Sequence, residues 1–335
     1  MALFPTHRNR VAGGALALML LTTLGITVAG PEDDSASAPG VPSSATPGAE
    51  AVAPSTAGSD VALDRLADDD TIPWPEDGQT AVELEGAGPV GARGEQRPVP
   101  IASLAKVMTA YVILKGHPLR QGEPGPDITV DRQAAHEVGV GGESTVPVQA
   151  GDRYSQRQLL EMLLIPSGNN IARLLARWDS GSQDAFVKKM QRAADELGMD
   201  HSRYTGASGI EPTTTSTATD QLKLVRQVMK DPVFRAVVAS RNVTVSGIGP
   251  ITNTNPLLDT PGVVGIKTGS STPAGGNLLW ACEVRVGDTT RLLTGAVLHQ
   301  RANTTPGEGL RAAVDNSRSL ITALRDRLAS ARTEG

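Results

Sequence analysis

The sequence predicts an α+β fold in which an antiparallel sheet, flanked by helices, is assembled from both ends of the folded part, with a mostly helical insert between them. Three observations support this prediction. Apolar residues recur at helical spacing through the middle of the chain, they alternate with a period of two toward the C-terminus, and an amphipathic helix closes the chain. The chain has 335 residues, which is enough for one large domain or two modest ones.

The N-terminal segment predicts export. His7, Arg8 and Arg10 precede a largely apolar stretch, residues 11–29, and positive charge followed by apolar residues is typical of a secretion signal. At about 19 residues, the stretch is also long enough to span a bilayer as an uncleaved anchor. We therefore interpret residues 1–30 as a signal peptide or membrane anchor, and expect the remainder to be secreted or held at the outer face of the membrane.

A linker is predicted after the signal segment. Residues 31–62 are mainly Pro, Ser, Ala and Gly with scattered acids and no apolar period. Burial could not offset the entropy lost on ordering such a segment, so we expect it to be disordered. The folded domain is then expected over residues 63–335, with the helical insert at about residues 115–235.

The folded part is expected to begin with a strand and a buried helix. Residues 79–84 alternate weakly, which favours a strand, and the Gly- and Pro-rich residues 86–100 are predicted to be a loop. Residues 101–114 are apolar almost all round, which is typical of a buried helix.

The helical insert carries clear start and stop signals. Ser155 and Gln158 form a capping-box pattern before an apolar helix, which Pro166 interrupts. Residues 167–170 then join this helix to a second one. Two further helices are expected, at residues 186–197, ending before Gly198, and at residues 222–229, before Asp231 and Pro232.

Strands follow the insert, and a helix ends the chain. The predicted strands are residues 242–246 and 263–268 and a hairpin of residues 278–286 and 290–298 around Gly287 and Asp288. Residues 310–328 have apolar residues at helical spacing with Arg on the other face, which predicts an amphipathic helix.

Composition excludes several classes of function. With 36 acidic and 31 basic residues, the net charge is −5, whereas a nucleic-acid partner usually requires a clustered basic face, so no such partner is expected. Cys282 is the single cysteine, which excludes an internal disulfide and a thiolate zinc site and predicts a small buried hydrophobe. No H-E-x-x-H motif or complete dinucleotide loop is present, so the motifs give no support for metal or nucleotide chemistry.

Ser103 and Lys106 form an S-x-x-K motif on the helix predicted over residues 101–114, and a spacing of three places both side chains on one face. A serine hydroxyl is a poor nucleophile unless a base takes its proton. Lysine can be that base only when it is neutral, which at an ordinary pKa holds for about one molecule in 2,500 at pH 7. Apolar neighbours and a second cation, Lys267, would lower the pKa. Taken alone, the motif also fits a lysine that extends out of a buried helix.

A second motif, S-x-N, lies at the joint between two predicted helices. Ser167 could relay a proton between Lys106 and a leaving amine, and Asn169 could donate to a substrate carbonyl. The alternative is ordinary capping and turn chemistry, for which Ser and Asn are also well suited.

A third motif, K-T-G, ends an alternating apolar run. Lys267, Thr268 and Gly269 fit an edge strand that pairs with an extended peptide, because the glycine leaves room for close approach. The lysine and threonine would hold a terminal carboxylate. The alternative is a solvated lysine on an edge strand.

In this order and spacing the three motifs resemble those of the serine penicillin-binding proteins and β-lactamases, and especially those of the low-molecular-mass D-alanyl-D-alanine carboxypeptidases. The resemblance covers roughly residues 79–330 and implies the β-lactamase/transpeptidase-like fold. Beyond the triplets it includes residues 101–111, 159–172, 186–209 and 253–276.

The resemblance implies a serine D-alanyl-D-alanine carboxypeptidase that removes the terminal D-Ala from peptidoglycan stem peptides through an acyl-enzyme, without a metal or organic cofactor. Ser103 would be the nucleophile and Lys106 its proton acceptor. Ser167 and Asn169 would be the second-motif pair. The substrate would be bound by Lys267, Thr268, Gly269 and Ser270. The backbone N–H groups of Ser103 and Ser270 would form the oxyanion hole. β-Lactams would be covalent inhibitors, and any membrane anchorage would come from residues 11–29.

Alternatives remain open at this point. A class A β-lactamase shares the motifs but deacylates with a glutamate in an E-x-x-L-N loop, which the surroundings of Glu211 do not match. A non-catalytic penicillin-binding envelope protein, a transpeptidase or an endopeptidase could carry the same motifs. Arg301 and Arg311 are both candidates for an arginine that helps to hold the substrate carboxylate. Asn170 stands where many relatives carry Asp.

Overall fold

The computed structural model describes residue 66 and residues 70–330, all of which belong to one compact unit that spans residues 54–335. The predicted signal or anchor, residues 1–30, and the predicted linker, residues 31–62, lie outside the described residues. Within the described part, every helix is too short or too polar to cross a membrane.

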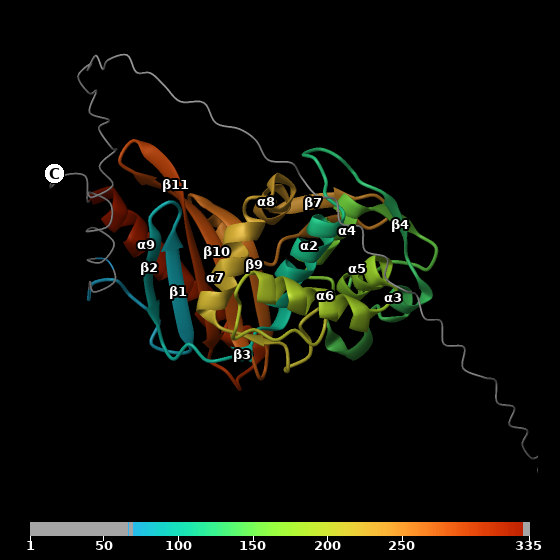
Figure 1. Cartoon of the computed structure of the whole chain (residues 1–335), viewed down its shortest axis with the longest axis horizontal. Coiled ribbons are helices and arrows are strands. Elements are labelled where there is room, and N and C mark those ends of the chain that lie inside the picture. Colours follow the sequence, from blue (N-terminus) through green and yellow to red (C-terminus); the bar gives the residue numbers. More distant parts are fainter. Residues whose placement is uncertain (1–65, 67–69, 331–335) are drawn as a thin grey trace, which may run out of the picture. The chain divides into compact units, whose positions relative to one another are not determined.

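A five-stranded antiparallel sheet lies at the centre of the described unit, with the strand order β2-β1-β11-β10-β9 (Figure 1). Gln79 pairs with Leu298, so strands from the two ends of the folded part are neighbours, as predicted. The predicted hairpin is also confirmed. The five strands are β1 (Gln79–Leu84), β2 (Gly88–Arg93), β9 (Val263–Ser271), β10 (Gly275–Val286) and β11 (Thr289–Gln300).

The prediction of a loop over residues 86–100 is wrong. Gly88–Arg93 form the edge strand β2, and Val99–Pro100 form β3, which pairs with β6 (Thr215–Ser216). Glycine and proline have low strand propensity, but Pro89 is tolerated in β2 because this strand pairs on one side only and needs fewer N–H donors. The neighbouring strand β1, not local propensity, determines the conformation of this segment.

Helices cover both faces of the sheet (Figure 1). The alternation of side chains along β10 divides the apolar residues: Leu278 and Trp280 pack with the helix α9, whereas Leu279 and Ala281 join the larger core on the opposite face. Cys282 is free and buried, as predicted. The helices on the two faces are α9 (Pro306–Ser330), which confirms the predicted closing helix, and α7 (Ala218–Val228) and α8 (Pro232–Ala239).

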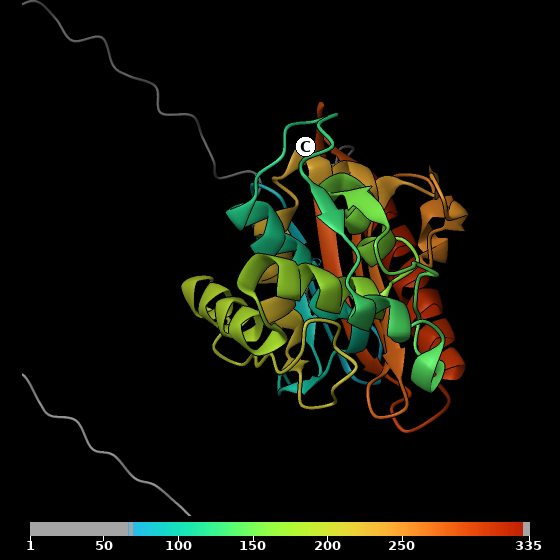
Figure 2. The ribbon, with the colours of Figure 1, turned by 90° about the vertical axis from the view of Figure 1, so that its right-hand side faces the viewer.

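The helix α2 (Ala105–Gly116) is buried as predicted; α4, α5 and α6 pack against it, and α3 packs on α5. Figure 2, viewed from the helical side, shows them in front of the sheet. The capping box at Ser155 and Gln158 is present, with both reciprocal hydrogen bonds. These helices are α3 (Arg132–His136), α4 (Gln156–Leu164), α5 (Asn169–Ser180) and α6 (Gln183–Glu196). The short elements are η1 (Ala102–Leu104), η2 (Val140–Gly142), η3 (Pro256–Asp259), β4 (Asp127–Thr129), β5 (Arg153–Ser155), β7 (Asn242–Val245) and β8 (Gly249–Thr252).

Two further elements differ from the prediction. The last helix of the insert was predicted to end before Asp231, with none after it. Instead α8 follows, because Asp231 accepts hydrogen bonds from the backbone of Val233 and Phe234 and Pro232 occupies the first helical position. The strand predicted over residues 242–246 exists as β7, and it pairs with β8 in a separate hairpin.

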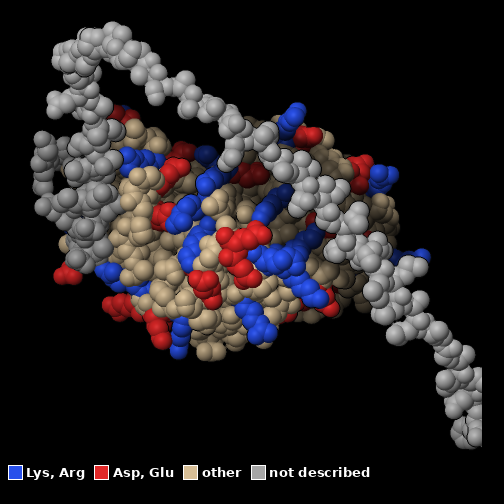
Figure 3. Space-filling view, viewed as in Figure 1, with Lys and Arg blue, Asp and Glu red and all other residues tan. Residues whose placement is uncertain are grey.

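Charged side chains of both signs are interspersed on the face shown in Figure 3, without a broad area of one sign. Some of these charges are paired across elements. Arg226 on α7 donates to both carboxylate oxygens of Glu83 on β1, at 2.8 and 2.5 Å. Such bidentate pairs add geometric specificity to the packing of α7 on the sheet.

Candidate active site

Ser103 and Lys106 are in contact at the start of the buried helix. Ser103 lies in η1 and Lys106 in the first turn of α2, and Lys106 Nζ lies 2.9 Å from Ser103 Oγ. The lysine side chain is 0% exposed, so the alternative of a lysine that extends into solvent is wrong. Its sequence neighbours Ala105 and Val107 are also fully buried, which provides the apolar surroundings that the sequence predicts.

The hydrogen bonds of Lys106 define what its amine can do. Besides Ser103, Nζ contacts Asn169 Oδ1 at 2.5 Å and the backbone oxygen of Ser208 at 2.9 Å. Carbonyl oxygens can only accept. A neutral amine has two N–H groups, and these two oxygens use both of them, which leaves the lone pair facing the Ser103 hydroxyl. The geometry therefore suits transfer of the serine proton to the lysine.

The charge state of Lys106 depends on its burial and on four charged neighbours. Burial lowers the pKa of Lys106 well below its ordinary value of 10.5, and the positive charges of Lys267 and Arg173 lower it further. The carboxylates of Glu143 and Glu211 raise the pKa and are smaller causes. The net effect favours the neutral amine that a general base requires.

The second motif forms the tight joint between α4 and α5. Ser167 has a left-handed backbone, with φ of 65°, and Asn169 is already the first residue of α5, so the joint ends earlier than the predicted 167–170. The structure brings Asn169 to Lys106. Ser167 Oγ is buried and has no hydrogen-bond partner among the described residues.

The third motif lies on β9, at the edge of the sheet, as predicted. Lys267 is 1% exposed, so the alternative of a solvated lysine is wrong. Its Nζ donates to the backbone oxygen of Thr268 at 3.0 Å, and burial lowers its pKa to about 7. Thr268 Oγ1 lies 2.9 Å from Thr254 Oγ1.

Gly269 brings β9 against the segment that carries Ser103. A Cβ at Gly269 would lie 3.0 Å from both the backbone N of Ser103 and the backbone oxygen of Ile101. Only glycine permits this approach without displacement. The next residue on the strand is Ser270, so the two backbone N–H groups predicted to form an oxyanion hole belong to adjacent segments.

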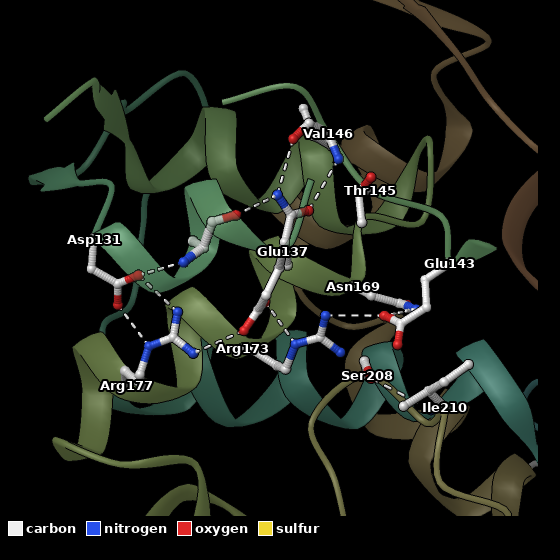
Figure 4. Close-up of polar contacts among 12 residues, drawn as sticks. Asp131, Glu137, Glu143, Thr145, Val146, Asn169, Arg173, Arg177, Ser208 and Ile210 are labelled. Atoms are coloured by element: carbon white, nitrogen blue, oxygen red, sulfur yellow. Dashed lines mark hydrogen bonds and ion pairs between the residues drawn. The ribbon is translucent and has the colours of Figure 1, made fainter. Parts of the chain in front are cut away.

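Glu143, Arg173 and Ser208 also belong to the hydrogen-bond network of Lys106 and were not predicted from the sequence. Glu143 Oε2 accepts from Asn169 Nδ2 at 3.0 Å and from Arg173 at 3.0 Å, and Figure 4 shows these side chains facing one another. The only sequence signal for Arg173 is its position one helical turn after Asn169. Glu143 follows a glycine-rich segment, and Ser208 contributes a backbone atom, so neither carries a recognisable motif.

Arg301 and Arg311, the two candidates for an arginine that helps to hold the substrate carboxylate, line the same cavity. This cavity, of about 690 Å³, is formed by residues 73–77, the end of β11 and α9. The backbone N–H of Arg301 donates to Asp77 Oδ2 at 2.6 Å. None of the eight predicted site residues lines this cavity.

Comparisons with known proteins agree with the motifs. A family model described as D-alanyl-D-alanine carboxypeptidase matches residues 86–293. The chain is 33% identical over 184 residues to D-alanyl-D-alanine carboxypeptidase DacD of Escherichia coli, covering 53% of this chain and 47% of the relative. It is 33% identical over 189 residues to a D-alanyl-D-alanine carboxypeptidase of a Streptomyces species, covering 51% of this chain and 64% of the relative. The chain therefore spans about half to two thirds of the length of these relatives.

Solved structures show the same architecture. Penicillin-binding protein 6B of Escherichia coli matches with a TM-score of 0.63 and 29% identity, over 76% of this chain and 79% of that chain. The Streptomyces DD-transpeptidase matches with a TM-score of 0.65 and 26% identity, over 77% of this chain and 99% of that chain. Both matches support the predicted transpeptidase-like α+β fold.

Proposed function

Because the chain belongs to the D-alanyl-D-alanine carboxypeptidase family, we propose that it is a serine hydrolase that removes the terminal D-Ala from peptidoglycan stem peptides ending in D-Ala-D-Ala. The observation that carries this proposal is the contact between Ser103 Oγ and the fully buried amine of Lys106, at 2.9 Å. A buried amine whose two N–H groups are occupied by carbonyl oxygens can accept the serine proton.

In the acylation step, Ser103 Oγ attacks the carbonyl carbon of the penultimate D-Ala while its proton moves to Lys106 Nζ. The C–N bond to the terminal D-Ala then breaks, and the leaving amine receives a proton. Ser167 would relay this proton: its hydroxyl is buried and has no hydrogen-bond partner among the described residues, so it is available to bond to the leaving amine. Water hydrolyses the resulting ester and regenerates the free serine.

The remaining site residues would bind the substrate. Asn169 would donate to the substrate backbone, and Lys267 and Thr268 would hold the terminal carboxylate. The peptide would lie beside β9, whose outer edge is unpaired in the central sheet, while Gly269 keeps the segment of Ser103 close to this strand. The backbone N–H of Ser270, together with that of Ser103, would stabilise the oxyanion, and losing one such donor typically reduces the rate by about 10²–10³-fold.

We also propose that the protein acts at the cell envelope, outside the cytoplasm, because its substrate is located there. Export would depend on residues 1–30, and membrane anchorage, where it occurs, on residues 11–29. β-Lactams are expected to acylate Ser103, since they would enter the same site as the peptide.

Intact-mass analysis with benzylpenicillin tests the nucleophile. The wild type is expected to gain the mass of one penicillin, and Ser103→Ala to gain none. Lys106→Ala should also lose the adduct, because no other neutral amine contacts the serine in the described part of the chain. Release of D-Ala from a diacyl-lysyl-D-Ala-D-Ala peptide then tests the reaction itself.

The same samples separate the alternatives. Turnover of benzylpenicillin many times per second would indicate a β-lactamase, and the absence of any adduct with the wild type would indicate a non-catalytic protein. Transfer of the acyl group to an added amine in preference to water would indicate a transpeptidase. A stable adduct together with D-Ala release supports the carboxypeptidase.

A further inference from the structure

We propose that Glu143 is a positioning residue for this reaction: its carboxylate, held by Arg173, fixes the orientation of the Asn169 amide that binds Lys106. The inference rests on the proposed function, because it concerns the geometry of the same reactive centre. Glu143 reaches Lys106 only through Asn169 in the hydrogen bonds of the described residues, so it would act by positioning and not on the substrate.

The amide of Asn169 has two ends, and only one orientation satisfies both of its neighbours. Its Oδ1 accepts from Lys106 Nζ at 2.5 Å, and its Nδ2 donates to Glu143 Oε2 at 3.0 Å. If the amide were flipped, its NH₂ group would face an N–H of Lys106, donor against donor, and its oxygen would face the carboxylate of Glu143, acceptor against acceptor. An ionised carboxylate can only accept, so it selects the orientation in which the amide oxygen faces the lysine.

Arg173 fixes the carboxylate in turn. It donates to Glu143 at 3.0 Å and to Glu137 at 2.8 Å, and its side chain is only 14% exposed. Figure 4 shows its guanidinium between the two carboxylates, with Arg177 and Asp131 continuing the alternation of charge. Charge-assisted hydrogen bonds of this kind are stronger than neutral ones and less screened when partly buried.

The backbone around Glu143 is tied to the second motif on both sides. Asn169 N donates to the backbone oxygen of Ser144 at 2.8 Å. The buried side chain of Asn170 accepts from Val146 N at 3.0 Å and donates to Val146 O at 2.9 Å. The loop that carries Glu143 is therefore held in register with the start of α5.

Charge provides a second, measurable link between Glu143 and Lys106. The charged groups that face the lysine are Lys267 on β9, Arg173 on α5, Glu143 and Glu211. Glu143 raises the pKa of Lys106 and Arg173 lowers it. Neutralising Glu143 should thus make the lysine neutral at lower pH, and neutralising Arg173 should do the opposite.

The experiment measures the rate of acylation by benzylpenicillin from pH 5 to pH 10. Glu143→Ala is expected to acylate about tenfold to a hundredfold more slowly, the usual effect of losing a hydrogen bond to a charged group. Glu143→Gln should recover part of this rate, because its amide oxygen can still accept from Asn169. The acylation rate falls at low pH when Lys106 becomes protonated. In Glu143→Gln this fall should occur at lower pH than in the wild type, and in Arg173→Met at higher pH.

Glu137→Gln is the matched control. Glu137 pairs with the same arginine and is similarly buried, 15% exposed against 21% for Glu143, but it does not contact Asn169. Its rate of acylation by benzylpenicillin should lie within about twofold of the wild-type rate, with the same dependence on pH. Equal losses in Glu137→Gln and Glu143→Ala, a wild-type rate in Glu143→Ala, or a fall in rate at an unchanged pH in Glu143→Gln and Arg173→Met would overturn the inference. A wild type that forms no adduct would instead refute the proposed function, and this inference with it.

Discussion

The burial of Lys267 should make the stability of the protein depend on pH above neutrality. Its pKa is about 7 in the folded chain and 10.5 ordinarily, because burial disfavours the ammonium. Each pKa unit corresponds to about 1.4 kcal/mol, so burying the charged form costs about 5 kcal/mol relative to burying the neutral amine. Lys267→Met removes this cost and keeps an apolar chain of similar length in the same space.

The direction in which the stability changes with pH follows from proton binding by Lys267. Between pH 7 and pH 10.5 the unfolded chain holds the lysine proton while the folded chain does not, so the wild type becomes more stable as the pH rises. From pH 6 to pH 9 the gain should be about 3 kcal/mol. Lys267→Met has no ionisable group at this position and therefore lacks this gain.

Urea unfolding of both proteins at pH 6, 7, 8 and 9 measures the effect. The stability advantage of Lys267→Met over the wild type should shrink by about 3 kcal/mol across this range. Lys188→Met, at an exposed position, is the control and should show no such trend. A difference between wild type and Lys267→Met that stays constant within about 1 kcal/mol would refute the argument.

Two further substitutions test the packing around the site. Gly269→Ala should slow acylation by benzylpenicillin about tenfold to a hundredfold, because its Cβ would press on the backbone of Ser103 at 3.0 Å; an unchanged rate would contradict the close approach of β9. Asn170→Asp should lower the free energy of unfolding by about 2–4 kcal/mol in urea titrations, because Nδ2 donates to the backbone oxygens of Ala134 and Val146 and a carboxylate cannot. Wild-type stability would show that this loop can rearrange.

The fold was predictable where apolar periodicity is strong. The hairpin of β10 and β11, the buried α2 and the closing α9 all have regular patterns, and the structure confirms them. The edge strand β2 was not predictable, because its conformation comes from pairing with β1 and its own residues are Gly- and Pro-rich. The helix α8 was missed because Asp231 and Pro232 can end one helix or begin another.

The site was predictable only as far as its motifs. Ser103 and Lys106 are three residues apart, so their contact follows from helical geometry. The third partner of the lysine, the backbone oxygen of Ser208, is 102 residues away and has no side-chain signature. Glu143 likewise acquires its partners through folding, 26 residues before Asn169, and no local pattern indicates it.

The pairing of β1 with β11 has a consequence for biosynthesis. Gln79 meets Leu298, so the central sheet cannot close until nearly the whole chain is available. The serine belongs to the early part of the chain and the strand beside it, β9, to the late part. A nascent or truncated chain would thus carry Ser103, the proposed nucleophile, without the strand beside it, and the proposed reactivity would arise only after β9 has joined the sheet, because contacts so distant in sequence form late.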